Sequence, residues 1–214
     1  PYILFFVLSG ATICWGLLTG TWFGSQTIAR LPFLNVFIID QLNSFGEGSQ
    51  DFMMFLSFVI GAVHLSIAHL MAGLRKIKSI TCIAEFAWMG IIWSLYFVGQ
   101  FLVLSKPMPD FMMPLFIGSI ILVLLFANFQ KNILKGIGIT LGNLLLDVIS
   151  GFSDVVSYLR LFAVGYATVV VASSFNGMAI GDGISSVFAG FGAAIILLLG
   201  HGLNIILAMM SVLV

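Results

Sequence analysis

Three ionisable residues lie inside one long apolar stretch toward the C-terminal end of the chain, and they are the residues best suited to chemistry. They are Asp147, Asp154 and Arg160. An arginine at the centre of a membrane helix costs about 3 kcal/mol on insertion scales, so such residues normally face protein or water and have a function. We therefore start from this group.

Helical geometry divides the polar residues of this stretch into two stripes. At 100° per residue, four residues fall within about 60° of one another and form an acidic stripe: Asp147, Gly151, Asp154 and Tyr158. A basic stripe about 120° further round contains Ser153, Ser157 and Arg160. This separation predicts a carboxylate-lined, water-accessible path on one side of the helix and a positive charge presented to a partner on the other.

Less specific interpretations of the same residues remain open. Arg160 could pair with a carboxylate elsewhere in the chain, such as Glu85, and only specify packing. Asp147 and Asp154 could be acids at a helix end that face cytoplasmic water, because both precede the apolar run from Leu159 to Val171.

The three histidines also lie in apolar stretches. A further stripe contains His201, Asn204, Ala208 and Ser211, and it could relay protons or hold water. His64 could line the same cavity as the acids, although a core hydrogen bond is the commoner role, and we expect His69 to extend toward the interface. No histidine pair has metal-ligand spacing with a third ligand, so we expect no metal site and no cofactor.

The composition places this chain in a membrane. Of its 214 residues, 61% are hydrophobic and 7% are charged, whereas soluble domains are about 25% charged. Eight basic and eight acidic residues balance, which argues against a nucleic-acid partner. Cys14 and Cys82 have no metal-type spacing, and we expect both to be free thiols.

We predict an all-α membrane protein, a polytopic bundle of about six transmembrane helices forming one domain over residues 1–214. The expected spans are Pro1–Phe23, Asp51–Leu74, Ile80–Leu104, Phe111–Phe129, Ile137–Phe175 and Ile184–Val214. The fifth covers about 39 residues, nearly 60 Å of helix and twice the hydrocarbon thickness. We therefore expect the last two helices to be long and tilted.

The basic residues of the loops predict the orientation. Five lie in the loops after the second and fourth spans: Arg75, Lys76, Lys78, Lys131 and Lys135. The loops on the other side carry only Arg30 and Lys106. By the positive-inside rule, the lysine-rich loops and both termini are expected in the cytoplasm.

Three connecting features have structural interpretations. The run from Leu31 to Ile39 is typical of a short interfacial segment, followed by a flexible turn. Ser105–Asp110 predicts a tight hairpin, because two prolines in three positions cannot continue a helix. Glycines at 16, 20 and 24 have the four-residue spacing that lets membrane helices approach closely.

Four segments resemble the membrane domain of the stator subunit of V-type and A-type ATPases, called subunit a in eukaryotes and subunit I in prokaryotes. The signature is Ser-Tyr-Leu-Arg-Leu-Phe-Ala at 157–163, preceded by an acid thirteen residues before the arginine, here Asp147. Gly-His-Gly-Leu-Asn at 200–204 and the Trp-Gly-Leu region within 10–24 also match. The resemblance covers the whole chain as the third to eighth of eight helices, and the segment from Asp147 to Ala163 is closest to the prokaryotic members.

This resemblance implies a mechanism and partners. In the family, the last two helices follow the outside of a rotating ring of c/K subunits. The signature arginine, here Arg160, faces the ion-binding carboxylate of the ring and separates two offset aqueous half-channels. A guanidinium stays charged at any working pH, so it draws the ring carboxylate into its ionised form and displaces the ion. The resemblance implies a bacterial or archaeal plasma membrane, with ring and lipid as partners.

The sequence departs from the family in three respects. The cytoplasmic domain, which would contact the peripheral and central stalks, and the first two helices are missing. The chain also stops before a second functional arginine. Thr168 occupies the position of a histidine in eukaryotic members, and Asp147 stands where prokaryotic members usually have Glu. We therefore expect a piece of a longer stator subunit.

Two other functions would also fit a polytopic chain. A secondary transporter would have paired broken helices in two related halves, and the sequence has no such repeat. A purely structural assembly module would use Arg160 only for packing. ATP hydrolysis is not expected in this chain, because the sequence contains no phosphate-binding loop.

Overall fold

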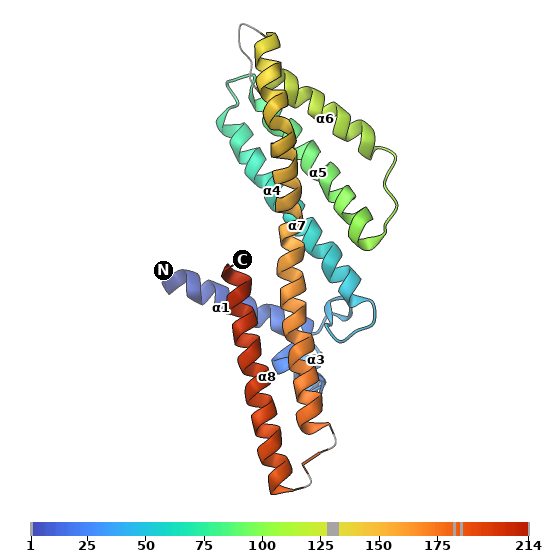
Figure 1. Cartoon of the computed structure of the whole chain (residues 1–214), viewed down its shortest axis with the longest axis vertical. Helices are drawn as coiled ribbons and strands as arrows, with labels where there is room; N and C mark the ends of the chain where they lie inside the picture. Colours follow the sequence, from blue (N-terminus) through green and yellow to red (C-terminus); the bar gives the residue numbers. More distant parts are fainter. Residues whose placement is uncertain (1, 128–132, 182, 185, 214) are drawn as a thin grey trace. The chain divides into compact units, whose positions relative to one another are not determined.

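The computed structural model describes residues 2–127, 133–181, 183–184 and 186–213 (Figure 1). The main helices are α1 (Tyr2–Thr19), α4 (Ser49–Arg75), α5 (Cys82–Leu104), α6 (Met112–Phe126), α7 (Ile133–Ile180) and α8 (Val187–Leu213). Four short helices connect α1 to α4: η1 (Trp22–Gly24), α2 (Gln26–Ala29), α3 (Pro32–Asn35) and η2 (Asp40–Leu42). No strand occurs among the described residues, so the all-α prediction is confirmed.

Five of these helices are long and apolar enough to cross a membrane: α1, α4, α5, α7 and α8. In hydrocarbon a helix satisfies its backbone hydrogen bonds internally, which is why apolar stretches of this length fold as helices. The predicted fourth span corresponds to α6, an apolar helix of 15 residues that is shorter than the other five. At 1.5 Å per residue it is about 22 Å long, less than the hydrocarbon thickness of about 30 Å.

Helix α7 is the longest element, with 48 residues in one continuous helix. It extends beyond the predicted Ile137–Phe175 at both ends, and at 1.5 Å per residue it measures about 72 Å. Helix α8 has 27 residues, the same length as α4. The tilt of these helices in a membrane remains a prediction.

The chain divides into two compact units, and α7 contributes to both. One unit is Met54–Arg160, which we call the acidic unit because it contains both aspartates of interest. The other combines Pro1–Met53 with Leu161–Val214, and we call it the terminal unit.

Helix α5 forms the centre of the acidic unit and is the most buried of the membrane-length helices. One apolar cluster joins it to α4 and α7 through Phe58, Ala62, Ile92, Tyr96 and Val155. A second cluster joins it to α6 and α7 through Ala87, Ile91, Leu95, Val123 and Leu144. Because α5 touches three neighbours, it determines which face of α7 is buried in this unit.

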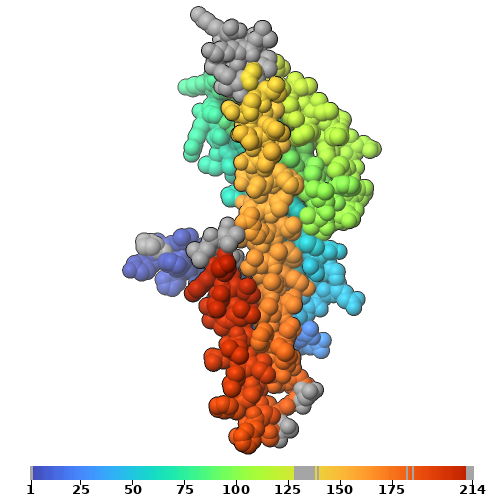
Figure 2. Space-filling model, in the orientation of Figure 1, coloured from blue at the N-terminus to red at the C-terminus, as the bar shows by residue number. Residues whose placement is uncertain are grey.

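In the terminal unit, α8 lies against the C-terminal part of α7 (Figure 2). The contact depends on a glycine, because a Cβ atom at Gly200 would lie 2.4 Å from the Phe175 ring. The connection after α1 also reaches α7, where Asn176 Nδ2 donates a hydrogen bond of 2.8 Å to the carbonyl oxygen of Phe23.

The expectation for the spaced glycines is wrong for two of the three positions. Helix α1 ends at Thr19, so Gly20 and Gly24 follow the helix instead of lining its face. Both have positive φ angles, 69° and 65°, which glycine adopts without steric cost. Gly24 still allows a close approach, because a Cβ there would lie 2.5 Å from the Cβ of Ala172.

The connecting segments expose apolar side chains and turn the chain between helices. Phe33, Val36 and Phe37 in and after α3 are exposed, and the interfacial position of this segment remains a prediction. The hairpin between α5 and α6 begins at Ser105, which adopts a left-handed conformation with φ 51°. Lys106 closes it with its Nζ 4.3 Å from the centre of the Phe55 ring. Cys14 and Cys82 are free thiols.

Replacing Gly24 by alanine should destabilise the terminal unit by about 2 kcal/mol, because the added methyl group meets Ala172 at a positive φ angle. Gly118→Ala in α6 is the matched control, since a Cβ there has nothing within 4 Å. It should be stabilising by about 0.5 to 1 kcal/mol. Thermal unfolding of the purified protein in detergent measures both, and equal midpoints for the two variants would contradict the close approach.

Candidate functional site

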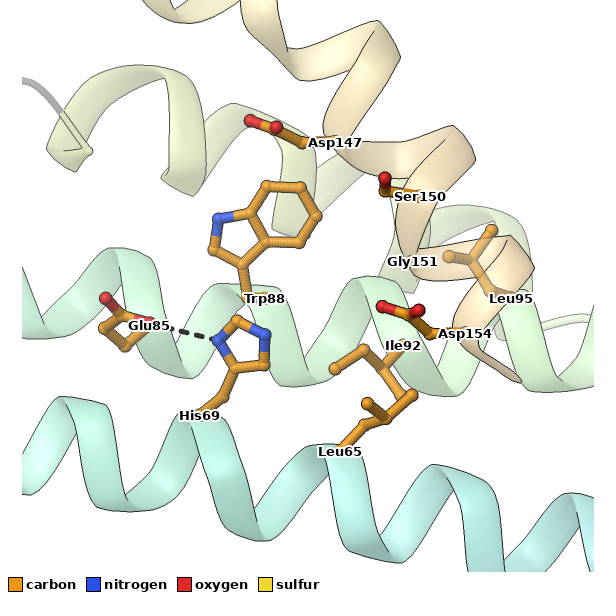
Figure 3. Close-up of a pocket in the computed structure, with 10 residues that line it drawn as sticks. All are labelled: Leu65, His69, Glu85, Trp88, Ile92, Leu95, Asp147, Ser150, Gly151 and Asp154. Atoms are coloured by element: carbon orange, nitrogen blue, oxygen red, sulfur yellow. Dashed lines mark hydrogen bonds and ion pairs between the residues drawn. The ribbon is translucent and has the colours of Figure 1, made fainter. Parts of the chain in front are cut away.

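A cavity of about 330 Å³ lies in the acidic unit between α4, α5 and α7 (Figure 3). We call it the acidic cavity. Its lining residues are Leu65, His69, Glu85, Trp88, Ile92, Leu95, Asp147, Ser150, Gly151 and Asp154. It combines an apolar floor with carboxylate, hydroxyl and imidazole groups, which is an unusual composition for a site between membrane-length helices.

Helix α7 supplies the acidic wall. Asp147, Ser150, Gly151 and Asp154 follow the i, i+3, i+4, i+7 pattern of one helix face, and all four line the cavity (Figure 3). Both aspartates are exposed in the folded chain. The predicted acidic stripe therefore exists from Asp147 to Asp154, and its carboxylates border an open space instead of the core.

The opposite wall carries an ionic cluster that the sequence interpretation missed. His69 Nδ1 lies 3.0 Å from Glu85 Oε2, and Lys76 Nζ lies 2.5 Å from Glu85 Oε1. The His69 ring also stacks on Trp88, with centroids 6.0 Å apart and planes at 17°. Glu85 and Trp88 hold the ring in the cavity wall. The expected position of His69 near a membrane interface remains a prediction.

The antiparallel helix hairpin explains how this cluster forms. His69 lies near the end of α4 and Glu85 near the start of α5, and a short connection between the helices brings the two residues to the same level. The signal in the sequence was a histidine and a glutamate placed on either side of a basic turn. It was missed because each residue, taken alone, looks like an ordinary helix-end polar group.

The alternative pairing of Arg160 with Glu85 is not favoured by this geometry. Both carboxylate oxygens of Glu85 already accept hydrogen bonds, from His69 and Lys76. Arg160 is exposed, and so is Ser153 on the same stripe, whereas Ser157 is half-buried. On the same side of α7, Leu146 and Ile149 are also exposed, at 66% and 57%.

Tyr158 and His64 form a separate contact. Tyr158 Oη and His64 Nδ1 are hydrogen-bonded, and the tyrosine ring lies directly against Gly61, where a Cβ would be 2.8 Å from the ring. Neither Tyr158 nor His64 lines the acidic cavity. Tyr158 therefore shares a helix face with the acids but packs against α4, and the role of His64 in an ion path remains a prediction.

A second cavity, of about 540 Å³, lies within the terminal unit. We call it the histidine cavity. It is lined by Thr21, Phe23, Gly24, Thr168, Val169, Ala172, His201, Asn204, Ile205 and Ala208. The predicted stripe of His201, Asn204 and Ala208 does face one space, while the side chain of Ser211 falls outside the described part of the chain.

Asn204, one of the residues that line this cavity, has a buried side-chain oxygen. Its Oδ1 is shielded from solvent and has no hydrogen-bond partner among the described residues. A buried amide oxygen without a partner is costly. Across the described ranges, no three His, Cys, Asp or Glu side chains gather closely enough to bind a metal.

Comparison with known proteins finds relatives along nearly the whole chain. V-type ATP synthase subunit I of Borreliella burgdorferi is 37% identical over 99% of this chain and 36% of its own length. V-type ATP synthase subunit I 1 of Treponema pallidum is 28% identical over 97% of this chain and 34% of its own length. The subunit I of Chlamydia pneumoniae is 28% identical over 75% of this chain and 24% of its own length.

The chain thus spans about a third of the length of the first two of these relatives. No family model and no solved structure matches it.

A cysteine at position 154 should react with a charged, water-soluble thiol reagent, because this side chain borders an open cavity. A cysteine at the neighbouring Val155, which is 0% exposed, should react roughly tenfold more slowly or not at all. The measurement compares labelling rates of the two variants in membranes, after Cys14 and Cys82 are replaced by serine. If the cysteine at position 154 were labelled as slowly as the cysteine at position 155, the cavity would be closed to water.

Proposed function

The chain is a homologue of V-type ATP synthase subunit I along 99% of its length, and from this premise we propose that it forms the ion-translocating membrane part of a rotary ATPase stator. In this proposal the chain contacts a rotating ring of c/K-type subunits. It provides two aqueous half-channels, one on each side of the membrane, and one arginine between them.

The arrangement of α7 carries the proposal. On this helix the side chains of Asp147 and Asp154 line an open cavity, while Arg160 is exposed on a different face of the same helix. The proposed ion path and the positive charge thus lie on different faces of one helix.

The proposed role of Arg160 is to displace the ion from the ring. The guanidinium remains protonated, so it favours the ionised form of a facing carboxylate and the release of its bound ion. The exposed apolar side chains of Leu146 and Ile149 on the same side of α7 support a contact with the apolar outer surface of the ring. Ser153 and Ser157 lie near Arg160 in the helix and are proposed to line the path beside it.

The acidic cavity is proposed as the cytoplasmic half-channel. Arg75, Lys76 and Lys78 end α4 and follow it, and by the positive-inside rule they lie in the cytoplasm, as do both termini. Asp147 and Asp154 would then exchange the ion with cytoplasmic water. Tyr158 and His64 are proposed to close the path beyond Asp154, because their hydrogen bond ties α7 to α4.

The histidine cavity is proposed as the half-channel of the outer side. His201 and Asn204 supply an imidazole and an amide, and Thr168 adds a hydroxyl. Along α7, Arg160 comes after the residues of the acidic cavity and before Thr168, the order that two half-channels separated by one charge require.

The remaining partners belong to the complex as a whole. We propose that the peripheral and central stalks contact parts of the subunit that this chain does not cover, and that membrane lipid surrounds the apolar helices. A bacterial or archaeal plasma membrane is the proposed location. All three relatives are bacterial proteins, which supports it.

Replacing Arg160 by glutamine should abolish ATP-driven ion uptake, because an uncharged amide does not favour the ionised form of the ring carboxylate. The measurement uses vesicles that contain the complete complex, with separate readouts for H⁺ and Na⁺. The variant complex must still co-purify with its ring.

Arg75→Gln is the matched control, since it removes the same charge from the exposed end of α4. It should retain uptake close to that of the unaltered complex. Continued uptake by the assembled Arg160→Gln complex would show that Arg160 is structural.

A further inference from the structure

We propose that His69 is a proton-transfer residue of the acidic cavity and that the ion crossing this cavity is therefore the proton. The inference rests on the proposed function, and it adds to that function the identity of the ion and one residue that handles it. The observation behind it is an imidazole with one nitrogen fixed by a carboxylate and the other turned to a cavity that contains two more carboxylates.

The first part of the argument is the orientation of the imidazole. Nδ1 of His69 is hydrogen-bonded to Glu85, at 3.0 Å. The two nitrogens of an imidazole point in widely different directions, so this bond directs Nε2 away from Glu85. Figure 3 shows the second nitrogen on the far side of the ring from Glu85. The bond to a carboxylate also assigns the proton of the neutral ring to Nδ1, which leaves Nε2 as an acceptor.

The second part is the rigidity of this arrangement. Trp88 stacks on the imidazole ring and limits its rotation, and Lys76 holds the second oxygen of Glu85 at 2.5 Å. The side chain of Glu85 is only 16% exposed. A histidine that served only as a surface group would need none of these supports.

The third part is the charge around the ring. Three carboxylates line the cavity with His69, from Glu85, Asp147 and Asp154, while Lys76 contacts Glu85. These groups place carboxylate oxygens on both walls of the cavity around the imidazole. The aspartates on the opposite wall are then suitable acceptors for the same proton.

In the proposed transfer step, Nε2 gains one proton and loses one proton, and the ring keeps the same tautomer. A proton from cytoplasmic water binds to Nε2, and the imidazolium keeps its Nδ1 proton in the hydrogen bond to Glu85. Nε2 then gives the proton to the carboxylate of Asp154 through water in the cavity. The neutral ring is restored with its proton on Nδ1, and the reverse sequence serves ion flow in the other direction.

This chemistry favours a proton over a sodium ion. Imidazole titrates near neutral pH and can both accept and release a proton there. Hard cations prefer oxygen ligands and have no use for an imidazole nitrogen. A path for sodium would need only the carboxylates and hydroxyls of α7.

The test uses the complete complex with His69→Ala in vesicles, and it measures ATP hydrolysis with an ionophore present so that no gradient forms. Hydrolysis coupled to ring rotation should slow at least about tenfold, because a proton-transfer group is lost. Added imidazole should restore the rate by entering the open cavity. Pyrazole has the same shape but does not titrate near neutral pH, so it should not restore the rate.

Two controls separate the possible results. His64→Ala removes a histidine of the same helix that does not line the acidic cavity, so imidazole should not restore any loss there. His69→Gln retains a donor for Glu85 and is the variant to use if His69→Ala does not assemble. It should also slow hydrolysis at least about tenfold.

Several results would overturn the proposal. These are normal hydrolysis by the His69 variants, equal restoration by imidazole and pyrazole, or uptake of Na⁺ without H⁺ by the unaltered complex. Arg160→Gln is measured in parallel. If it stops uptake while the His69 variants do not slow hydrolysis, only the role of His69 fails, whereas continued uptake with Arg160→Gln means that the stator function itself fails.

Discussion

An ionised group among apolar helices must be paired within the protein or face water, and this constraint organises the acidic unit. The Glu85 carboxylate is paired, because His69 and Lys76 occupy both of its oxygens. Asp147 and Asp154 border an open cavity instead. The cost of leaving a charge in hydrocarbon explains why each of these residues has a partner or access to water. The paired cluster and the open cavity are thus two solutions to the same physical problem on facing walls.

Helix α7 has one buried face, one face that borders a cavity and one exposed face. Val155 and Leu144 bury one face against α5 and its neighbours, and the acids border the cavity. The side with Arg160 is exposed. The helix has 48 residues and contributes to both compact units. The central position of α5 matters here, since its contacts determine which side of α7 is covered.

Homology and geometry support the proposed function in different ways. The relatives are named subunits of a V-type ATP synthase. The proteins from Borreliella burgdorferi and Treponema pallidum match almost the whole chain, which covers about a third of their own length. The geometry adds what a name does not contain, namely two cavities with different chemistry, one in each compact unit, and an exposed arginine on α7. The acidic cavity is lined by three carboxylates, whereas the histidine cavity is lined by an imidazole and an amide. The two proposed half-channels therefore differ in chemistry.

The sequence by itself determined the helical membrane class, the approximate spans and the spacing that turns Asp147 and Asp154 to one side and Arg160 to another. These features depend on local hydropathy and on the fixed rotation of 100° per residue, which neighbouring helices do not alter. Only the tertiary structure decided that His69 meets Glu85, that Tyr158 packs against Gly61, and that Gly24 supports a turn instead of a helix face. Each of these depends on which helix lies opposite, and helix packing is specified by side-chain shapes from distant parts of the chain.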